Sequence, residues 1–201
     1  MRHLLVPLAA LALVAGCTPD AAPTGSPSVF PSPTVSATPS PTPTPSPSPS
    51  AVESFPPAPA TESPEQAAIR AAWMEYWRIH HKFSADPTLS DLTETQNITT
   101  GDQQNLILDS ISQLREAKLR TLGGLQFRSV SVGSPTVDAG TKRTAVITYC
   151  VDRSELRLEN YDTGETMTAP GAPTFLETTT MQEGLDGRWR VAMILNEEAA
   201  C

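Results

Sequence analysis

Residues 63–83, SPEQAAIRAAWMEYWRIHHKF, form the stretch around which the rest of the chain must pack. Ser63 can cap a helix, Pro64 suits its first turn, and Gln66 completes a capping box. Apolar and aromatic side chains recur at helical spacing and share one face. They are Ile69, Ala72, Trp73, Tyr76, His80 and Phe83. The stretch therefore predicts a long amphipathic helix, which ends near residues 84–87 because the residue before a proline avoids helical backbone.

Two more helices are predicted before the pattern changes. TLSDLTETQNI, residues 88–98, predicts a short helix. A longer helix is predicted from Gln103 to Leu122, capped by Asp102 or Gly101 and stopped by the glycine pair that follows.

Beyond the glycine pair the apolar period falls from 3.6 to 2, which is typical of β-strands. Strands are predicted at residues 125–132, 144–151, 155–159, 174–182 and 189–195. The second of these, TAVITYCV, is apolar on both faces and should be central. In the third, Leu156 and Leu158 should point inward. In the last, one face is predicted to carry Trp189, Val191, Met193 and Leu195.

Turn residues separate these strands. Gly133-Ser134-Pro135 predicts a bulge or bend, and Asp186-Gly187 predicts a hairpin turn. Helices that precede a run of strands favour the α+β class. We therefore expect one domain over residues 65–201, with N-terminal helices packed on a curved antiparallel sheet of four to six strands.

The beginning of the chain carries a different signal. Arg2 and His3 precede an apolar run from Leu4 to Gly16, which is typical of a secretory signal peptide and is too short to span a bilayer as a helix. The run Val14-Ala15-Gly16-Cys17 resembles the bacterial lipobox. The resemblance implies a signal peptide over residues 1–16, cleavage after Gly16, and lipidation of Cys17.

Lipidation of Cys17 with fatty acyl chains such as palmitate would hold the protein on the extracytoplasmic face of the cell membrane, since two acyl chains are enough for stable anchoring. The alternative is an ordinary signal peptide with a chance cysteine. The cysteine count favours the anchor. The chain has three cysteines, and lipidation of one leaves Cys150 and Cys201 as a pair. Disulfides persist outside the cytosol, so we predict that these two are bonded.

Residues 17–64 are predicted to be a disordered linker. Fifteen prolines fall between residues 18 and 64, mostly alternating with serine or threonine. Such a composition cannot build a packed core. It favours extended polyproline II, which would reach at most about 145 Å. We interpret it as a spacer between the membrane and the domain.

Several features of residues 65–201 together resemble the nuclear-transport-factor-2-like superfamily. They are the YW pair in the first helix, YCVD in a central strand, DTGE in a turn, and DGRWRV in the last strand before a C-terminal cysteine. The closer resemblance is to exported lipoproteins of high-GC Gram-positive bacteria and their phages. It implies a cone-shaped roll whose curved sheet wraps a long helix and leaves a pocket. Some relatives are isomerases or cyclases, and many others bind or scaffold without catalysis.

No catalytic, cofactor or metal motif is recognisable in the sequence. His80 and His81 are adjacent on one helix and point about 100° apart, so they do not form a metal pair. Possible pocket-lining residues are Tyr76, Trp77, His80 and Tyr149. Core packing is the alternative for all four. The net charge is −8 and the basic residues are scattered, which argues against a nucleic-acid partner.

Three functions remain open on the sequence. The leading hypothesis is a non-catalytic module on the cell surface that binds a cell-wall component, a protein or a small molecule. The second is a small-molecule isomerase or cyclase, for which a pocket acid or base with a shifted pKa would be needed. The third is a phage-encoded lipoprotein that blocks superinfection.

Overall fold

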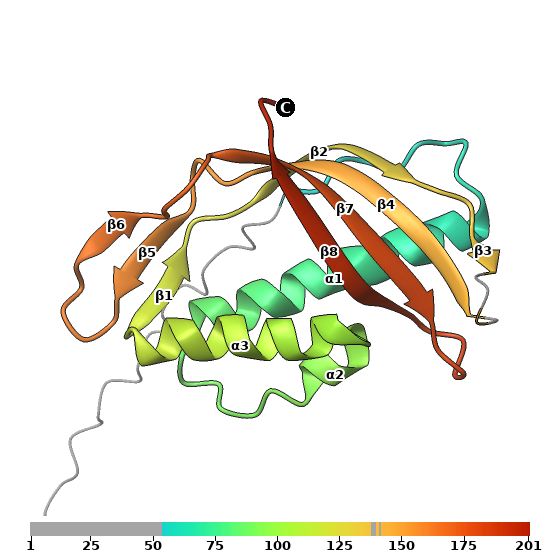
Figure 1. The fold of residues 1–201 in the computed structure, drawn as a ribbon. Helices are drawn as coiled ribbons and strands as arrows, with labels where there is room; N and C mark the ends of the chain where they lie inside the picture. Colours follow the sequence, from blue (N-terminus) through green and yellow to red (C-terminus); the bar gives the residue numbers. More distant parts are fainter. Residues whose placement is uncertain (1–53, 138–139, 141) are drawn as a thin grey trace, which may run out of the picture. The chain divides into compact units, whose positions relative to one another are not determined.

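The computed structural model describes residues 54–137, 140 and 142–201. The expected signal peptide, Gly16, Cys17 and most of the expected linker lie outside these residues. Within them the chain is an α+β domain, as the sequence predicts, with three helices against two antiparallel sheets (Figure 1). No helix in this part of the chain has the length and apolar character needed to cross a bilayer.

Helix α1 runs from Pro64 to Ala85 and lies across the inner face of the larger sheet (Figure 1). The predicted capping box is present, because Ser63 accepts from the backbone N–H of Gln66 and the Gln66 side chain accepts from the Ser63 backbone. The helix ends where the residue before Pro87 turns extended. Helix α2, Glu94–Ile98, is shorter than the stretch that predicted it.

The larger sheet has the order β2-β4-β7-β8, with β3 pairing beside β2 on the edge of β4. The bounds are β2, Gln126–Val132; β3, Thr136–Val137; β4, Arg143–Asp152; β7, Thr174–Glu183; and β8, Trp189–Glu198. Strand β4 is central, as predicted. Its inward residues Ala145, Ile147, Tyr149 and Val151 are all buried. They pack against α1, where Trp73 lies 4.8 Å from the Tyr149 ring and 5.1 Å from the Phe127 ring.

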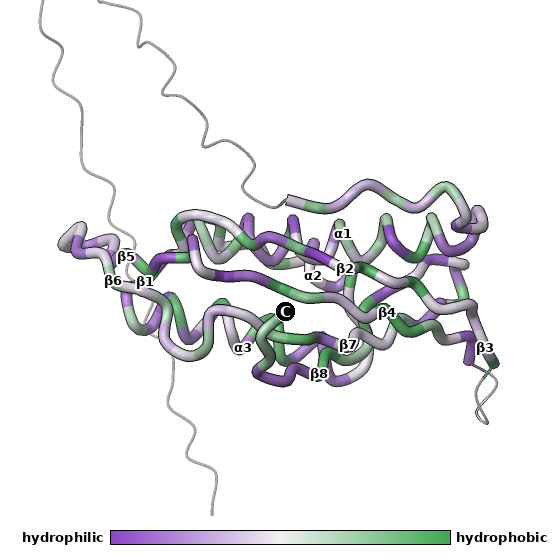
Figure 2. Tube along the Cα trace, turned by 90° about the horizontal axis from the view of Figure 1, so that it is seen from above, coloured by the Kyte–Doolittle hydropathy of each residue, from purple (hydrophilic) through white to green (hydrophobic). Residues whose placement is uncertain are grey.

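The smaller sheet has the order β1-β5-β6 and lies at the opposite end of the domain from β3 (Figure 2). Its strands are β1, Leu119–Leu122; β5, Arg157–Asn160; and β6, Thr166–Thr168. Strand β1 corrects the expectation of a helix to Leu122. Helix α3 runs from Asp102 only to Glu116, and Lys118 then has φ of 60°. The apolar spacing fits either structure, and pairing of β1 with β5 decides for a strand.

The strands carry one irregularity that the sequence predicts and two bulges that it does not. The bulge or bend predicted at residues 133–135 is present, because the strand is interrupted there and Val132 pairs with Ile147 while Thr136 pairs with Thr144. A further register shift of β2 against β4 lies between Arg128 and Ser131, where Ser129 has φ of 53°. In β8 a register shift opposite Thr180 and Met181 inserts one residue. Because an extra residue reverses the side-chain alternation, Trp189 and Val191 are buried while Met193 and Leu195 are 42% and 57% exposed. The expected shared face is therefore broken halfway along the strand.

The packed domain begins before the expected boundary at residue 65. Ser54 forms a parallel bridge to Gln126, and Phe55 stacks on Phe127 with ring centroids 4.8 Å apart. Further along, Glu62 forms a buried ion pair with Arg70 of α1. The last eleven residues assigned to the linker, 54–64, are thus part of the folded unit.

A disulfide joins Cys150 of β4 to Cys201 at the C-terminus, with Cα atoms 5.8 Å apart. The predicted pairing is present. Cys150 pairs across the sheet with Leu176 of β7, which pairs in turn with Glu197 of β8. The C-terminal residues therefore cross over β7 to reach β4.

Candidate functional site

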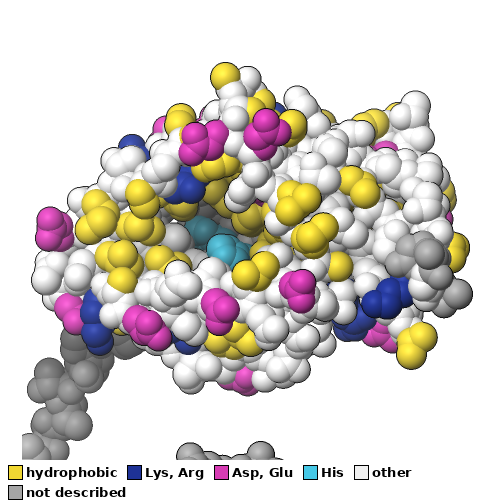
Figure 3. Space-filling view, viewed as in Figure 1, with side chains coloured by type: hydrophobic (Ala, Val, Ile, Leu, Met, Phe, Trp, Pro, Cys, Tyr) yellow, Lys and Arg dark blue, Asp and Glu magenta, His cyan; other side chains and the backbone are white. Residues whose placement is uncertain are grey.

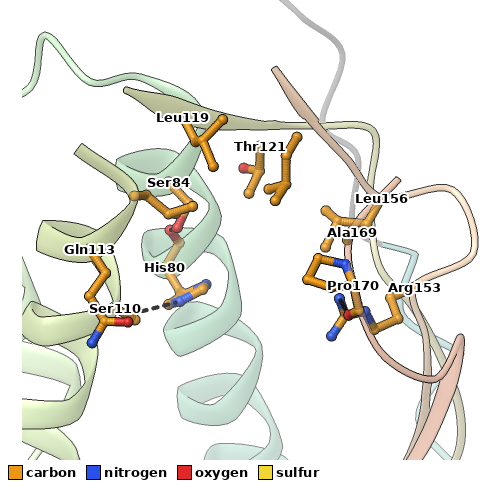
Figure 4. Close-up of a pocket in the computed structure, with 12 residues that line it drawn as sticks. His80, Ser84, Ser110, Gln113, Leu119, Thr121, Arg153, Leu156, Ala169 and Pro170 are labelled. Carbon is orange, nitrogen blue, oxygen red and sulfur yellow. Dashed lines mark hydrogen bonds between the residues drawn. The ribbon is translucent and has the colours of Figure 1, made fainter. Parts of the chain in front are cut away.

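A cavity of about 340 Å³ opens between the end of α1, helix α3 and the smaller sheet. Figure 3 shows a hollow on this side of the molecule, with histidine atoms at its floor and hydrophobic side chains around it. The polar lining residues are His80, Ser84, Ser110, Gln113, Thr121 and Arg153. The apolar lining residues are Leu114, Leu119, Leu156, Leu158, Ala169 and Pro170. Figure 4 shows how they surround the space from several elements.

Local structure explains why these side chains converge. His80 and Ser84 are one turn apart on α1 and share a helix face, and Ser84 donates to the His80 carbonyl over 2.8 Å. Thr121 of β1 pairs directly with Leu158 of β5, so both point to the same side of the smaller sheet. The helix predicted to run through residue 121 would have placed this threonine elsewhere.

His80 is neutral at physiological pH. Burial, with a smaller contribution from the neighbouring His81, lowers the pKa of its imidazole to about 4. The hydroxyl of Ser110 lies 3.4 Å from His80 Nε2 and donates to the carbonyl of Ile107 over 2.9 Å. We therefore assign the Nε2 proton to His80, with the Ser110 oxygen as its acceptor. This pair is unsuited to nucleophilic catalysis, because the histidine is a weak base and the serine proton points away from it.

Thr121 has a polar atom without a partner. The residue is only 9% exposed, and its side-chain oxygen is buried and forms no hydrogen bond. A buried hydroxyl left unpaired costs about 1–3 kcal/mol, so such groups usually meet a partner of some kind. Thr121 also lines the cavity, so a bound molecule that reaches this hydroxyl can supply the missing acceptor.

Arg153 is the charged residue of the lining. Its guanidinium donates to the Pro170 carbonyl over 2.7 Å and lies 5.6 Å from the centre of the Phe175 ring. These contacts hold the cation on one wall of the cavity, opposite the helices (Figure 4). The ion pairs within 4 Å found among the described residues involve other basic side chains, and the interaction of Arg153 with a carboxylate is the longer-range one with Glu177.

Of the four residues expected to line a pocket, His80 does so. Tyr76, Trp77 and Tyr149 belong to the aromatic core and are at most 8% exposed. Tyr76 stacks beneath His80 at 6.1 Å, and its hydroxyl accepts from Gln103 over 2.8 Å. These three aromatics therefore support the floor of the cavity and do not form its wall.

A second polar group lies deeper and was missed in the sequence. Glu177 of β7 is 7% exposed and accepts a hydrogen bond of 2.7 Å from the Tyr149 hydroxyl, which also lies 2.9 Å from Thr179. Burial raises the pKa of the Glu177 carboxyl, and Arg153 opposes this with its positive charge. Burial also raises the pKa of Tyr149. The signal was present in TFLETTTMQ, because Glu177 has the same parity as Met181 and so points inward.

Metal binding has no support among the described residues, which contain no group of three or more histidine, cysteine or acidic side chains placed around a common point. The two cysteines of this part of the chain are bonded to each other. What the cavity offers is therefore an apolar space with a neutral floor, one buried hydroxyl without a partner, the exposed amide of Gln113 and one cation.

No protein-family model matches the chain, and no curated protein matches it. Several solved structures are similar to the chain, including the following two. The intermembrane space region of chloroplast protein ARC6 is 12% identical with a TM-score of 0.48, covering 69% of this chain and 98% of that one. A protein from Catenulispora acidiphila is 15% identical with a TM-score of 0.37, covering 66% of this chain and 93% of that one. Neither likeness identifies what the cavity holds.

Proposed function

We propose that this protein is an exported lipoprotein, anchored to the extracytoplasmic face of the cell membrane, whose nuclear-transport-factor-2-like domain binds a small molecule without catalysing a reaction. The observation that carries the binding proposal is an open, largely apolar cavity whose lining includes Thr121, a residue with a buried hydroxyl that has no partner. Binding needs an apolar space with a few convergent polar groups, and the cavity meets that description.

Three features support the anchor. The lipobox-like Val14-Ala15-Gly16-Cys17 follows an apolar run, and a proline-rich segment separates it from the domain. The bond between Cys150 and Cys201 uses the other two cysteines, which leaves Cys17 as the one thiol for lipid. A disulfide also suits an exported protein.

Native mass spectrometry on the full chain, extracted gently from its host membrane, tests the binding function. We expect a co-purifying mass of a small molecule. Leu158→Trp should remove that mass by filling the cavity, whereas Val146→Trp, at an exposed position on the other sheet, should retain it. A bare lipoprotein, or a small mass that persists in Leu158→Trp, would overturn binding in this cavity.

A small-molecule isomerase or cyclase is the second candidate, and Glu177 favours it. A buried carboxyl with a raised pKa beside a tyrosine hydroxyl is the kind of group that transfers protons in active sites. Glu177 nevertheless does not line the cavity, so a substrate held there would not reach it without movement. Turnover of the co-purified molecule by the native chain, lost in Glu177→Gln, would replace the binding proposal with this one.

A further inference from the structure

We infer that the ligand of the cavity is a compact apolar monocarboxylate that also carries one neutral oxygen acceptor. This inference rests on the proposed binding function and assigns its ligand class. It is drawn from four properties of the cavity: one cation, one buried hydroxyl without a partner, a neutral floor and a limited volume.

The carboxylate follows from Arg153. A guanidinium that lines an apolar cavity and donates to no carboxylate in the described chain retains donors for a ligand, since the Pro170 carbonyl takes one N–H only. Arginine presents a planar fork that matches the two oxygens of a carboxylate. The low polarity of the leucine-rich wall strengthens this attraction relative to the same pair in water.

The neutral floor of the cavity indicates that the ligand carries a single charge. His80 is neutral, and Ser84 and Ser110 both direct their protons to backbone carbonyls. No second cation lines the space. A second anionic group would therefore be buried without a counter-charge, which costs several kcal/mol.

The neutral oxygen follows from Thr121. Its hydroxyl has no acceptor among the described residues, and it lies beside Leu158 on the smaller sheet. A ketone, ester or hydroxyl oxygen in the apolar body of the ligand would accept from it. The volume limits the body, because about 340 Å³ holds roughly a dozen water-sized groups.

The probes are three small molecules with closely similar bodies: 4-oxo-4-phenylbutyrate, 4-phenylbutyrate and 4-phenylbutyramide. The first has the carboxylate and the ketone, the second has the carboxylate alone, and the third is a neutral isostere. Each is titrated calorimetrically at pH 7 into the full chain in lipid nanodiscs, with empty nanodiscs subtracted. We expect 4-phenylbutyrate to bind about tenfold more tightly than its amide, and the keto acid about fivefold more tightly again.

Matched variants assign each preference to its residue. Arg153→Gln should abolish the preference for carboxylate over amide, and Arg153→Lys should keep part of it, which separates charge from loss of the Pro170 contact. Thr121→Val should abolish only the advantage of the keto acid. Arg188→Gln removes the same charge from the distant β7–β8 hairpin and should leave all three affinities unchanged.

Equal binding of acid and amide, or a carboxylate preference that survives Arg153→Gln, overturns the inference. A keto acid that binds no better than 4-phenylbutyrate overturns the assignment of the neutral oxygen. Absence of heat with every probe overturns the ligand class. The two proposals can fail separately. A co-purified mass that remains in Leu158→Trp overturns binding in this cavity. A co-purified neutral molecule that is lost from Leu158→Trp overturns the ligand class alone.

Discussion

Removal of the disulfide is the perturbation whose size follows most directly from the structure. The bond joins residues 51 apart in sequence, Cys150 in the central strand and Cys201 at the chain end. Closing a loop of that length restricts the unfolded chain by about 4 kcal/mol at 25 °C in the chain-entropy model. In a domain of about 150 residues each kcal/mol shifts Tm by about 2–4 °C, so the loss corresponds to about 12 °C.

The folded state should tolerate the change, because β8 keeps its ladder to β7 without the bond. The test compares the full chain with the double variant Cys150→Ala/Cys201→Ser in urea, followed by tryptophan fluorescence. The double variant should be less stable by about 4 kcal/mol and should no longer respond to a reducing agent. A loss below about 1 kcal/mol, or a response to reductant in the double variant, would refute the loop-closure argument.

The remaining predictions concern pH, packing and the anchor. The folded pKa of His80, about 4, lies below its unfolded value of 6.5. The contribution of this group to stability, at most about 3 kcal/mol, is therefore present above pH 6.5 and is lost as pH falls toward 4. His80→Gln should flatten that part of a stability-versus-pH curve, and an unchanged slope would contradict the assignment. The folded pKa of Glu177 is raised, so stability falls as pH rises from the unfolded pKa through the folded one. Glu177→Gln can still accept the hydrogen bond from Tyr149 and should remove this loss of stability. Thermal unfolding at neutral pH should therefore show the variant to be the more stable protein. Phe55→Ala removes a half-buried ring from the core and should cost about 2 kcal/mol in urea unfolding, whereas no loss would mean that residues 54–63 do not stabilise the domain. Cys17→Ala should abolish detergent-dependent membrane partitioning, and unchanged partitioning would count against the lipid anchor.

The architecture was predictable because its signals are local. The Ser63–Gln66 capping box marks the start of α1, and the two-sided apolar strand at residues 144–151 has to be central to bury both faces. Helical spacing also placed Trp73 and Tyr76 on the buried face correctly. These features depend on residues within one or two turns, which a sequence shows directly.

The misplaced elements depend on pairing between distant segments. Leu119–Leu122 has apolar spacing that suits a helix, yet it pairs with β5, nearly forty residues later. The inserted residue in β8 places Met193 on the exposed face of the strand instead of the buried one, and no turn residue in the sequence indicates the insertion. Both errors follow from tertiary contacts that override local preference.

The candidate site was only partly predictable for the same reason. His80 was identified because it shares a helix face with aromatic residues. Thr121 was not, since its role depends on a strand that was expected to be helix. Arg153 lies in a connection after β4, and nothing local distinguishes it from the other arginines of the chain. A cavity lined by four elements is a property of their assembly.

The end of β4 connects the structural constraints of this protein to its candidate site. Asp152, the last residue of β4, pairs with Gln126, which in turn bridges to Ser54 where the described chain begins. Cys150, two residues earlier, carries the disulfide. Arg153 follows immediately and reaches the cavity. The segment nearest the linker and the C-terminal bond therefore both fix the strand that positions the cation. Rigid placement matters there, because a guanidinium distinguishes a carboxylate from a neutral group only when its donors are held in the geometry of the fork.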